Sequence, residues 1–342
     1  MDRPDVVSFA VLWRRAARRL EAEDSKLCDL DDDALRVIHG GLSDTLNPGI
    51  AAVFRSLCKG LWEPTKGLVK QLRDEHDAAA VLCLKMGMPS CRELREAQGP
   101  IPLMNNASFS AADLELLGGL GRSLPELRSF VLGSIAAGAA GPDGVPRLAA
   151  GLGAGALPEL ASFQLSNILM GNTGASALAA ALGQGALLRL KSLYLGNTAI
   201  GAAGLVALAP ALRRRPALES LYICGNPFGD EGLAALVAPP PAGAPPPPAG
   251  GLKKLRSLNL AYNQITDAGC ATLAAALDSG ALPVLDVLDL DGNPASAAAK
   301  EAVLAALARS KATTPYRKSR ALPPDSGWTW PPGRRYRRDW WT

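Results

Sequence analysis

A nine-residue frame recurs along the chain and restricts its fold more than any other feature of the sequence. Apolar residues, mostly leucine, stand at the first, fourth and sixth positions of this frame, and asparagine stands at the ninth. Three complete copies end at Asn226, Asn263 and Asn293, whereas two copies upstream have Thr198 and Ile168 in the asparagine position. Recurrence at a regular period is typical of a repeat architecture in which each unit stacks on the next.

The spacing of the copies indicates about seven units. Their central apolar residues follow one another at intervals of 28 to 33 residues, with one longer interval of 37. These residues are Ile101, Phe130, Phe163, Leu193, Leu221, Leu258 and Leu288. The long interval contains a proline-rich insertion at 238–251. Because proline lacks a backbone donor and cannot continue a helix or a central strand, we expect this insertion to be a surface loop on the convex side.

Each unit combines the periodicity of a strand with that of a helix. Leu258 and Leu260 alternate with outward residues, as in a strand that has one buried face. Further along a unit, apolar residues such as Leu205, Leu208 and Leu212 have helical spacing. One strand and one helix cannot bury their apolar faces alone, so neighbouring units must stack. We therefore predict an α/β fold in which a parallel sheet lines a concave face and helices cover the convex side.

Units of this length with full helices resemble the leucine-rich repeats of the ribonuclease-inhibitor-like class, over residues 101–310. The resemblance implies a horseshoe-shaped solenoid. We expect Asn226, Asn263 and Asn293 to form a structural asparagine ladder, because inward amides can bond backbone groups that would otherwise be buried without partners. The alternative is an ordinary doubly wound α/β domain.

The strand residues that point outward define a candidate surface for a partner. We predict that another protein binds there, on the concave face. The candidate residues are Gln164, Tyr194, Tyr222, Asn259, Asp289 and Asp291. A neighbouring column of serines leaves room for a bulky element of the partner, and Tyr194 and Tyr222 supply rigid amphipathic contacts. The alternative is that the serines merely fit a crowded parallel sheet and the tyrosines only cover it.

Residues 1–100 lack the repeat and are predicted to form a helical module. The segment at about 27–66 resembles an F-box, because Cys58-Lys59 and Trp62 stand near the places of that family's C-terminal signature. The resemblance implies docking of a Skp-type adaptor of a ubiquitin ligase. The contacts would come from Leu30, Leu35, Ile38, Phe54, Leu57 and Trp62. The family's usual Leu-Pro opening is missing, and the alternative is a plain helical cap over the open edge of the first repeat.

Residues 311–342 form a basic tail that is rich in tryptophan and arginine. Eight lysines and arginines and two aspartates give the tail a net charge of 8 − 2 = +6, and four of the six tryptophans lie in it. Arginines interleaved with aromatic residues suit binding to nucleic acid or to an anionic membrane. Alternatively the tail folds back, with Trp328 and Trp330 shielding the apolar edge of the last repeat.

No group of residues indicates catalysis, a metal or a cofactor. The two histidines, His39 and His76, lie in the helical module without a nucleophile at a fixed offset, so each is interpreted as a surface or boundary residue. The six cysteines form no C-x-x-C pair, which argues against a zinc site. No secretory signal or membrane span is evident, which favours a reducing location in the cytoplasm or the nucleus.

The sequence therefore predicts a monomeric, non-enzymatic scaffold that binds another protein. Two other functions are kept as alternatives. A true F-box would make the chain a substrate receptor of a Skp-type ubiquitin ligase. Proteins that activate the GTPase Ran share this repeat class, although they often have an acidic tail and the tail of this chain is basic.

Overall fold

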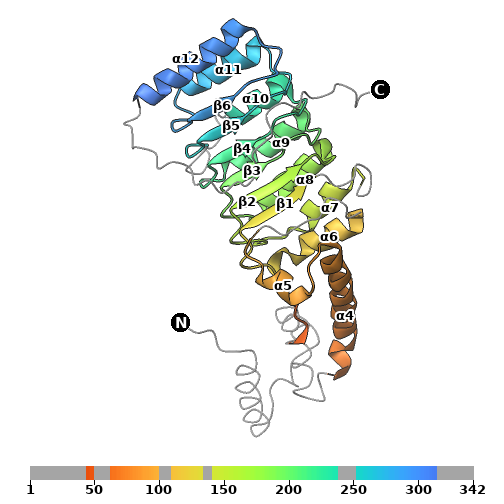
Figure 1. Ribbon diagram of the computed structural model, residues 1–342. Helices are drawn as coiled ribbons and strands as arrows, with labels where there is room; N and C mark the ends of the chain where they lie inside the picture. The colour runs from red at the N-terminus through yellow and green to blue at the C-terminus, as the bar shows by residue number, and fades with distance from the viewer. Residues whose placement is uncertain (1–43, 50–61, 100–108, 134–140, 238–251, 314–342) are drawn as a thin grey trace.

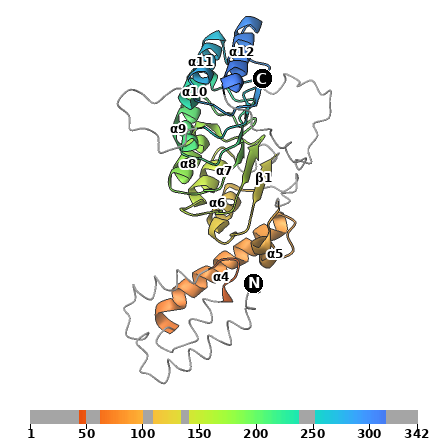
Figure 2. The ribbon, with the colours of Figure 1, turned by 90° about the vertical axis from the view of Figure 1, so that its left-hand side faces the viewer.

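Six short parallel strands, hydrogen-bonded in the order of the sequence, form one sheet in the described part of the chain. The computed structural model describes residues 44–49, 62–99, 109–133, 141–237 and 252–313. The possible first copy at Ile101, the proline-rich insertion and the residues from 314 onward lie outside these ranges. The strands lie side by side along the length of the stack (Figure 1), and the repeat helices lie along one side of the sheet that they form (Figure 2).

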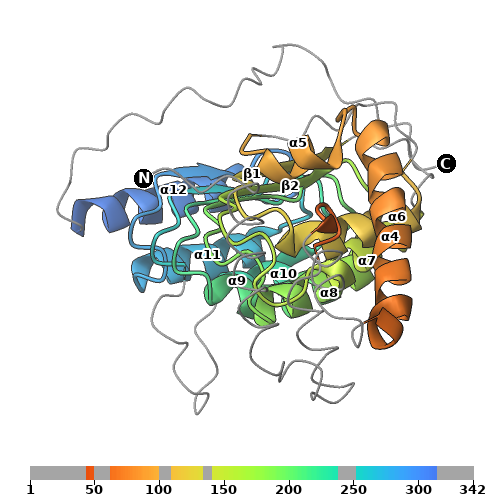
Figure 3. The ribbon, with the colours of Figure 1, turned by 90° about the horizontal axis from the view of Figure 1, so that it is seen from below.

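Each strand is followed by the helix of the same repeat. The strands are β1 (Ser129–Gly133), β2 (Ser162–Ser166), β3 (Ser192–Tyr194), β4 (Ser220–Tyr222), β5 (Ser257–Asn259) and β6 (Val287–Asp289). The helices that follow them are α7 (Gly144–Gly151), α8 (Gly171–Gly183), α9 (Ala202–Arg213), α10 (Gly229–Val237), α11 (Asp267–Asp278) and α12 (Ala297–Thr313). The helices form a layer on one side of the sheet (Figure 3), which confirms the predicted α/β leucine-rich repeat horseshoe. The last helix ends at Thr313, three residues beyond the repeat boundary that the sequence suggested at 310.

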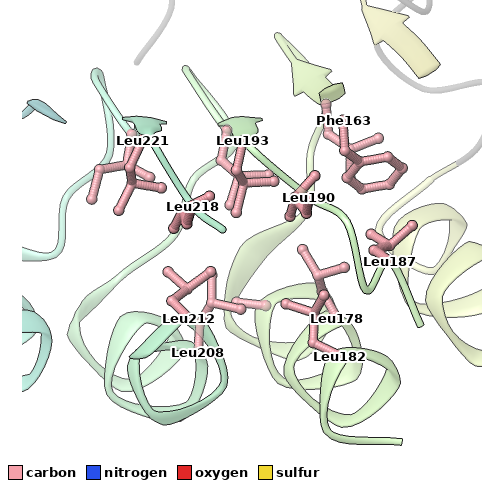
Figure 4. Packing of buried hydrophobic residues seen from close by; sticks show 14 of the residues in the cluster. Phe163, Leu178, Leu182, Leu187, Leu190, Leu193, Leu208, Leu212, Leu218 and Leu221 are labelled. Carbon is pink, nitrogen blue, oxygen red and sulfur yellow. The ribbon is translucent and has the colours of Figure 1, made fainter. Parts of the chain in front are cut away.

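The register of the sheet places equivalent apolar residues side by side. Leu193 pairs with Leu221, and Leu221 pairs with Leu258. All three side chains are fully buried. Leu193 and Leu221 point toward helix residues such as Leu208 and Leu212 (Figure 4). Burying a leucine stabilises a fold by about 1.5–3 kcal/mol, so each layer of the stack contributes strongly to the free energy of unfolding.

Buried asparagines connect the turns that follow the strands. The side-chain oxygen of Asn226 accepts hydrogen bonds from the backbone N–H groups of Thr198 at 3.1 Å and Ile200 at 2.9 Å. Its amide nitrogen donates to the carbonyl oxygen of Leu195 at 2.7 Å. Asn293 forms the corresponding three bonds with the repeat before it. Each amide also donates to a carbonyl oxygen of its own turn, Ile223 for Asn226 and Leu290 for Asn293, and so satisfies buried backbone groups of two successive turns.

The remaining members of this row form fewer bonds. Asn263 accepts from the backbone N–H of Asn226 at 2.8 Å, but its amide nitrogen has no hydrogen-bond partner among the described residues. Thr198 takes the asparagine position one repeat earlier, and its hydroxyl donates to the carbonyl oxygen of Leu195 at 2.9 Å. The hydroxyl of Thr198 thus donates to one of the carbonyl oxygens to which an asparagine amide would donate in this position.

A second set of polar residues links the start of a helix to the preceding repeat. The carboxylate of Asp267, in the first turn of α11, accepts from the backbone N–H of Ser296 at 2.6 Å and from its hydroxyl at 3.0 Å. The first N–H groups of a helix lack partners within the helix, so such bonds stabilise its start. The pairs of this kind are Asn172 with Gly201, Asp230 with Thr266, and Asp267 with Ser296.

One buried position of the repeat holds an arginine where the other repeats have leucine. The residues in this position are Leu157, Leu187, Arg215, Leu252 and Leu282, and none is more than 6% exposed. The guanidinium of Arg215 donates to the carbonyl oxygen of Leu182 near the end of α8, whereas its Nε has no partner among the described residues. Burial lowers the pKa of Arg215. The array therefore contains a charged group at a site built for an apolar one.

Helices also close the N-terminal end of the described repeats. They are α4 (Trp62–Lys85), α5 (Cys91–Glu96) and α6 (Ala111–Gly119), the last followed by the short helix η2 (Leu120–Arg122). An ion pair of 2.7 Å between Lys85 and Asp113 connects α4 to α6. A methyl group on Gly118 of α6 would lie 2.2 Å from the carbonyl oxygen of Leu148, so α6 and α7 cross in close contact. Within the described residues, no helix has the length and apolar character needed to span a membrane.

We expect Asn226→Ala to lower the free energy of unfolding by about 3 kcal/mol, because the buried N–H groups of Thr198 and Ile200 would lose their acceptor. Asn172→Ala serves as the control: it removes an exposed cap and should cost about 1 kcal/mol. Denaturant unfolding of both variants measures the difference. Equal losses for the two variants would contradict the role given to the buried amide.

We expect Arg215→Leu to raise the free energy of unfolding by about 1–3 kcal/mol, since leucine fits this position in four other repeats and removes a desolvated charge. The neighbouring exposed Arg214 provides the control, because Arg214→Leu should leave stability nearly unchanged. Thermal and denaturant unfolding measure both effects. A loss of stability in Arg215→Leu would mean that the bond to Leu182 outweighs the cost of burying the guanidinium.

Candidate binding surface on the concave face

The strands hold the predicted partner-binding residues on the face of the sheet that points away from the helices. Buried and half-buried residues alternate along β1 and β2, so Val131 and Gln164 lie side by side on the outer face. The parallel register then continues this row through Tyr194, Tyr222, Asn259 and Asp289. Asp291 follows two residues beyond Asp289. The fold thus gathers the candidate residues from five successive strands on one surface.

Two stacked tyrosines occupy the middle of this row. The ring centroids of Tyr194 and Tyr222 are 4.7 Å apart, and the rings are inclined by only 11°. The hydroxyl of Ser257 donates to the hydroxyl oxygen of Tyr222 at 3.1 Å. Burial, and secondly the neighbouring Tyr222, raise the pKa of Tyr194, while a hydrogen bond with Ser192 lowers it. The pair therefore presents a stacked, half-buried aromatic surface.

The surface becomes acidic toward β6. The amide nitrogen of Asn259 donates to Asp289 at 3.0 Å, and the other carboxylate oxygen of Asp289 accepts from the backbone N–H of Asp291 at 3.0 Å. Asp289 is half-buried, whereas Asp291 is exposed. Hence Asp289 is fixed by its neighbours, and Asp291 is the carboxylate that a partner can reach most easily.

Small residues flank the tyrosines on both sides. Ser192 and Ser220 precede them in the strands, and Gly196 and Cys224 follow. A methyl group on Gly196 would lie 3.1 Å from the sulfur of Cys224, so the two repeats are in close contact there. Burial raises the pKa of the Cys224 thiol, which keeps it neutral and a poor nucleophile at neutral pH.

A row of residues with left-handed backbone forms the rim of the concave face. Asn167 and Asn197 both have φ of 55°, and the amide of Asn197 donates to the side-chain oxygen of Asn167 at 2.9 Å. Tyr262, in the same position of a later repeat, has φ of 58° and is 58% exposed, with its ring against Gly292. The repeat pattern of the sequence did not predict this rim. The rim could have been predicted from the residue just before the ninth position of the frame, which is asparagine or glycine in most copies. These two residue types adopt φ > 0 most readily.

The structure does not describe the side chains predicted to bind an adaptor. Leu30, Leu35, Ile38, Phe54 and Leu57 lie outside the described residues, and Trp62 is described only as the first residue of α4. His76, on the same helix, donates a hydrogen bond from its Nδ1 to the carbonyl oxygen of Thr45 at 2.7 Å, so it has a structural partner.

An open groove of about 750 Å³ lies between α4 and α6, lined by residues that include Lys70, Asp74, Val81 and Leu116. Within the described ranges, no three histidine, cysteine, aspartate or glutamate residues are grouped so that they could hold a metal ion.

Comparisons with known proteins identify the repeat. The Leucine Rich repeat family model matches three consecutive segments, residues 190–209, 216–237 and 251–274. No curated protein matches the sequence. Among solved structures, the chain is similar to the actin-binding site 2 of leiomodin-1, with 20% identity, a TM-score of 0.31, and coverage of 41% of this chain and 73% of that one.

Two further solved structures are similar at the same level. An internalin from Listeria monocytogenes has 18% identity and a TM-score of 0.30, with coverage of 57% of this chain and 48% of that one. The Rad7 and Elc1 complex of yeast has 15% identity and a TM-score of 0.35, with coverage of 87% and 78%. The chain therefore contains leucine-rich repeats, and its strands and helices have the arrangement of that class of solenoid.

We expect Tyr194 to ionise above the ordinary tyrosine pKa of 10.0, and to stay above it in Tyr222→Phe, because burial is the largest cause of the shift. The raised pKa means that the folded state holds this proton more tightly than the unfolded state. Its contribution to stability is therefore complete below pH 10.0 and is lost as the pH rises through the higher folded-state pKa. Ultraviolet titration of tyrosinate in both proteins, with Tyr194→Phe to assign the signal, tests this expectation. Ionisation of Tyr194 at or below 10.0 would contradict it.

Proposed function

We propose that the chain is a non-enzymatic scaffold that binds another protein on the concave face. The observation that supports this proposal is the stacked pair of Tyr194 and Tyr222, in the middle of an outward row with small residues on both sides. Tyrosines held in this way offer a large contact area, lose little rotamer freedom on binding, and are frequent among the residues that dominate protein interfaces.

The charges around the sheet favour a protein partner over nucleic acid. A nucleic-acid surface needs lysines and arginines that follow the phosphate backbone. The position just before each strand carries charges of both signs instead: the residues are Arg128, Ala161, Lys191, Glu219, Arg256 and Asp286. Asp289 and Asp291 add negative charge at one end of the concave face. We therefore propose a neutral or weakly basic protein surface as the ligand.

We also propose that the repeats belong to the ribonuclease-inhibitor-like class. Two features support this assignment: the intervals of about thirty residues between copies, and α-helices of 8 to 17 residues on the convex side of the described repeats. Full helices on that side keep the strands close together on the concave side, and this curvature lets a partner contact several repeats at once.

A second proposal concerns the N-terminal module. Cys58-Lys59 and Trp62 support docking of a Skp-type adaptor, in which case the repeat array would select the substrate of a ubiquitin ligase. We expect a purified Skp-type adaptor to bind the full chain and to lose binding with Leu57→Asp. Tyr222→Ala is the matched control, because its site lies in the repeats and should leave adaptor binding unchanged. No binding of the adaptor to the wild-type chain would overturn this second proposal and leave the first intact.

The concave-face proposal is tested with partners identified by proximity labelling in the source cell and then purified. We expect the double variant Tyr194→Ser, Tyr222→Ser to weaken partner binding at least about tenfold, because removal of two aromatic anchors costs more than about 1.4 kcal/mol. Val206→Ser on α9, at a 40% exposed convex position, is the control and should bind as the wild type does. Equal affinity of the tyrosine variant and the wild type for every partner would contradict the proposal.

A further inference from the structure

The last strand differs from the others at its first outward position. The residues paired across the sheet at this position are Ser129, Ser162, Ser192, Ser220, Ser257 and Val287. Ser257 is buried at 8% exposure, whereas Val287 is 51% exposed. A valine has therefore replaced the serine only in β6, the C-terminal edge strand of the described sheet, where no further described strand covers it.

Two more apolar residues are uncovered at the same end of the stack. Leu288 is only partly buried, although its partner Leu258 and the equivalent Leu221 of β4 are fully buried. Leu304, on α12, is 52% exposed. The corresponding residues of the preceding helices, each sixteen residues beyond the central strand residue, are Ala179, Ala209, Val237 and Ala274, and all are buried or partly buried. The last repeat thus ends in an apolar edge formed by Val287, Leu288 and Leu304.

One backbone group of this edge is already bonded by α12, the last helix of the described residues. In an earlier repeat, the carbonyl oxygen of Arg256 accepts from the backbone N–H groups of Asp286 and Val287, at 2.7 and 2.9 Å. The carbonyl oxygen of Asp286, which stands in the same place in the last repeat, accepts instead from the ammonium of Lys311 at 2.8 Å. Lys311 also forms an ion pair of 2.8 Å with the Asp286 carboxylate. The ammonium of Lys311, at the end of α12, therefore donates the hydrogen bond that backbone N–H groups of a following repeat would donate.

We propose that residues 314–342 continue this cover and dock on the apolar edge formed by Val287, Leu288 and Leu304. The segment starts three residues after Lys311, whose ammonium contacts Asp286, the residue just before β6. Its 342 − 313 = 29 residues can extend about 95 Å at roughly 3.3 Å each, far more than an edge strand of three residues requires. The place where the segment leaves the described fold therefore brings it directly to the uncovered surface.

The composition of the segment matches the edge. It contains Trp328, Trp330, Trp340 and Trp341, whose rings can cover the exposed valine and leucines. Its seven lysines and arginines and two aspartates give a charge of 7 − 2 = +5. The edge presents the carboxylates of Asp289, Asp291 and Glu301, of which the last two belong to exposed residues. Apolar and charged groups of the two surfaces are thus complementary, which favours the chain's own tail over a second copy of the same acidic edge.

Tryptophan fluorescence of the full chain reports on this docking directly, because four of the six tryptophans lie in the segment. The double variant Val287→Ser, Leu304→Ala gives Val287 the serine of the preceding strands and Leu304 the alanine of three of the four preceding helices named above, so the fold is retained. We expect its emission to shift to the red and its quenching by acrylamide to increase relative to the wild type. The control is Leu169→Ser, Leu188→Ala, at mid-array positions that are 56% and 57% exposed, and it should show neither change.

Three outcomes would overturn the proposal. The first is a wild-type emission already typical of fully exposed indole and unchanged in the edge variant. The second is the same red shift in the mid-array control as in the edge variant. The third is a wild-type dimer in sedimentation that the edge variant dissociates, since a second copy would then occupy the edge. A monomer in both proteins, with the red shift confined to the edge variant, supports the proposal.

Discussion

Burial of each repeat against its two neighbours is the constraint on which this structure depends. A three-residue strand and a helix of three turns have too little apolar contact between them to be stable in water. Leu193 is fully buried because the strands of the neighbouring repeats lie beside it and the helix layer lies beneath it. The concave face follows from the same constraint, since the strands must be adjacent and therefore present their outward residues in rows. The Tyr194–Tyr222 stack is one result of that spacing.

Polar groups determine how the layers fit together. The inward amides of Asn226 and Asn293 bond backbone groups of the preceding turn, so a shift of one repeat relative to the next would leave several buried groups without partners. The repeats that depart from this pattern are expected to be less stable than the others. Asn263 has an unpaired amide nitrogen within the described structure, and Arg215 places a charge in a position of leucines. Local opening is expected to begin near such repeats, because fewer favourable contacts hold them.

The sequence predicted the fold well because the leucine positions are local and periodic, so Leu221, Leu258 and their neighbours could be assigned to adjacent strands without coordinates. It also predicted which residues face outward along the strands. It did not predict the pair of Asp267 and Ser296, because those residues are 29 positions apart and neither belongs to the repeated frame. The repeated frame did not predict the exposure of Val287 either, because that exposure depends on the position of β6 at the edge of the described sheet. The adaptor-binding candidates, such as Leu57, lie outside the described residues and remain predictions.

The helix caps supplied by the preceding repeat have a consequence for how such an array can change in evolution. Asp230 and Thr266 are 36 positions apart, compared with 29 for Asp267 and Ser296, because the proline-rich insertion lies between them. The bond is nevertheless formed at an ordinary distance of 2.8 Å. New sequence added directly after a convex helix thus leaves both the strand spacing and the cap intact. The junction after α10 is accordingly a place where this architecture can acquire a new segment, or where one can be grafted, without disturbing the tyrosines on the opposite face.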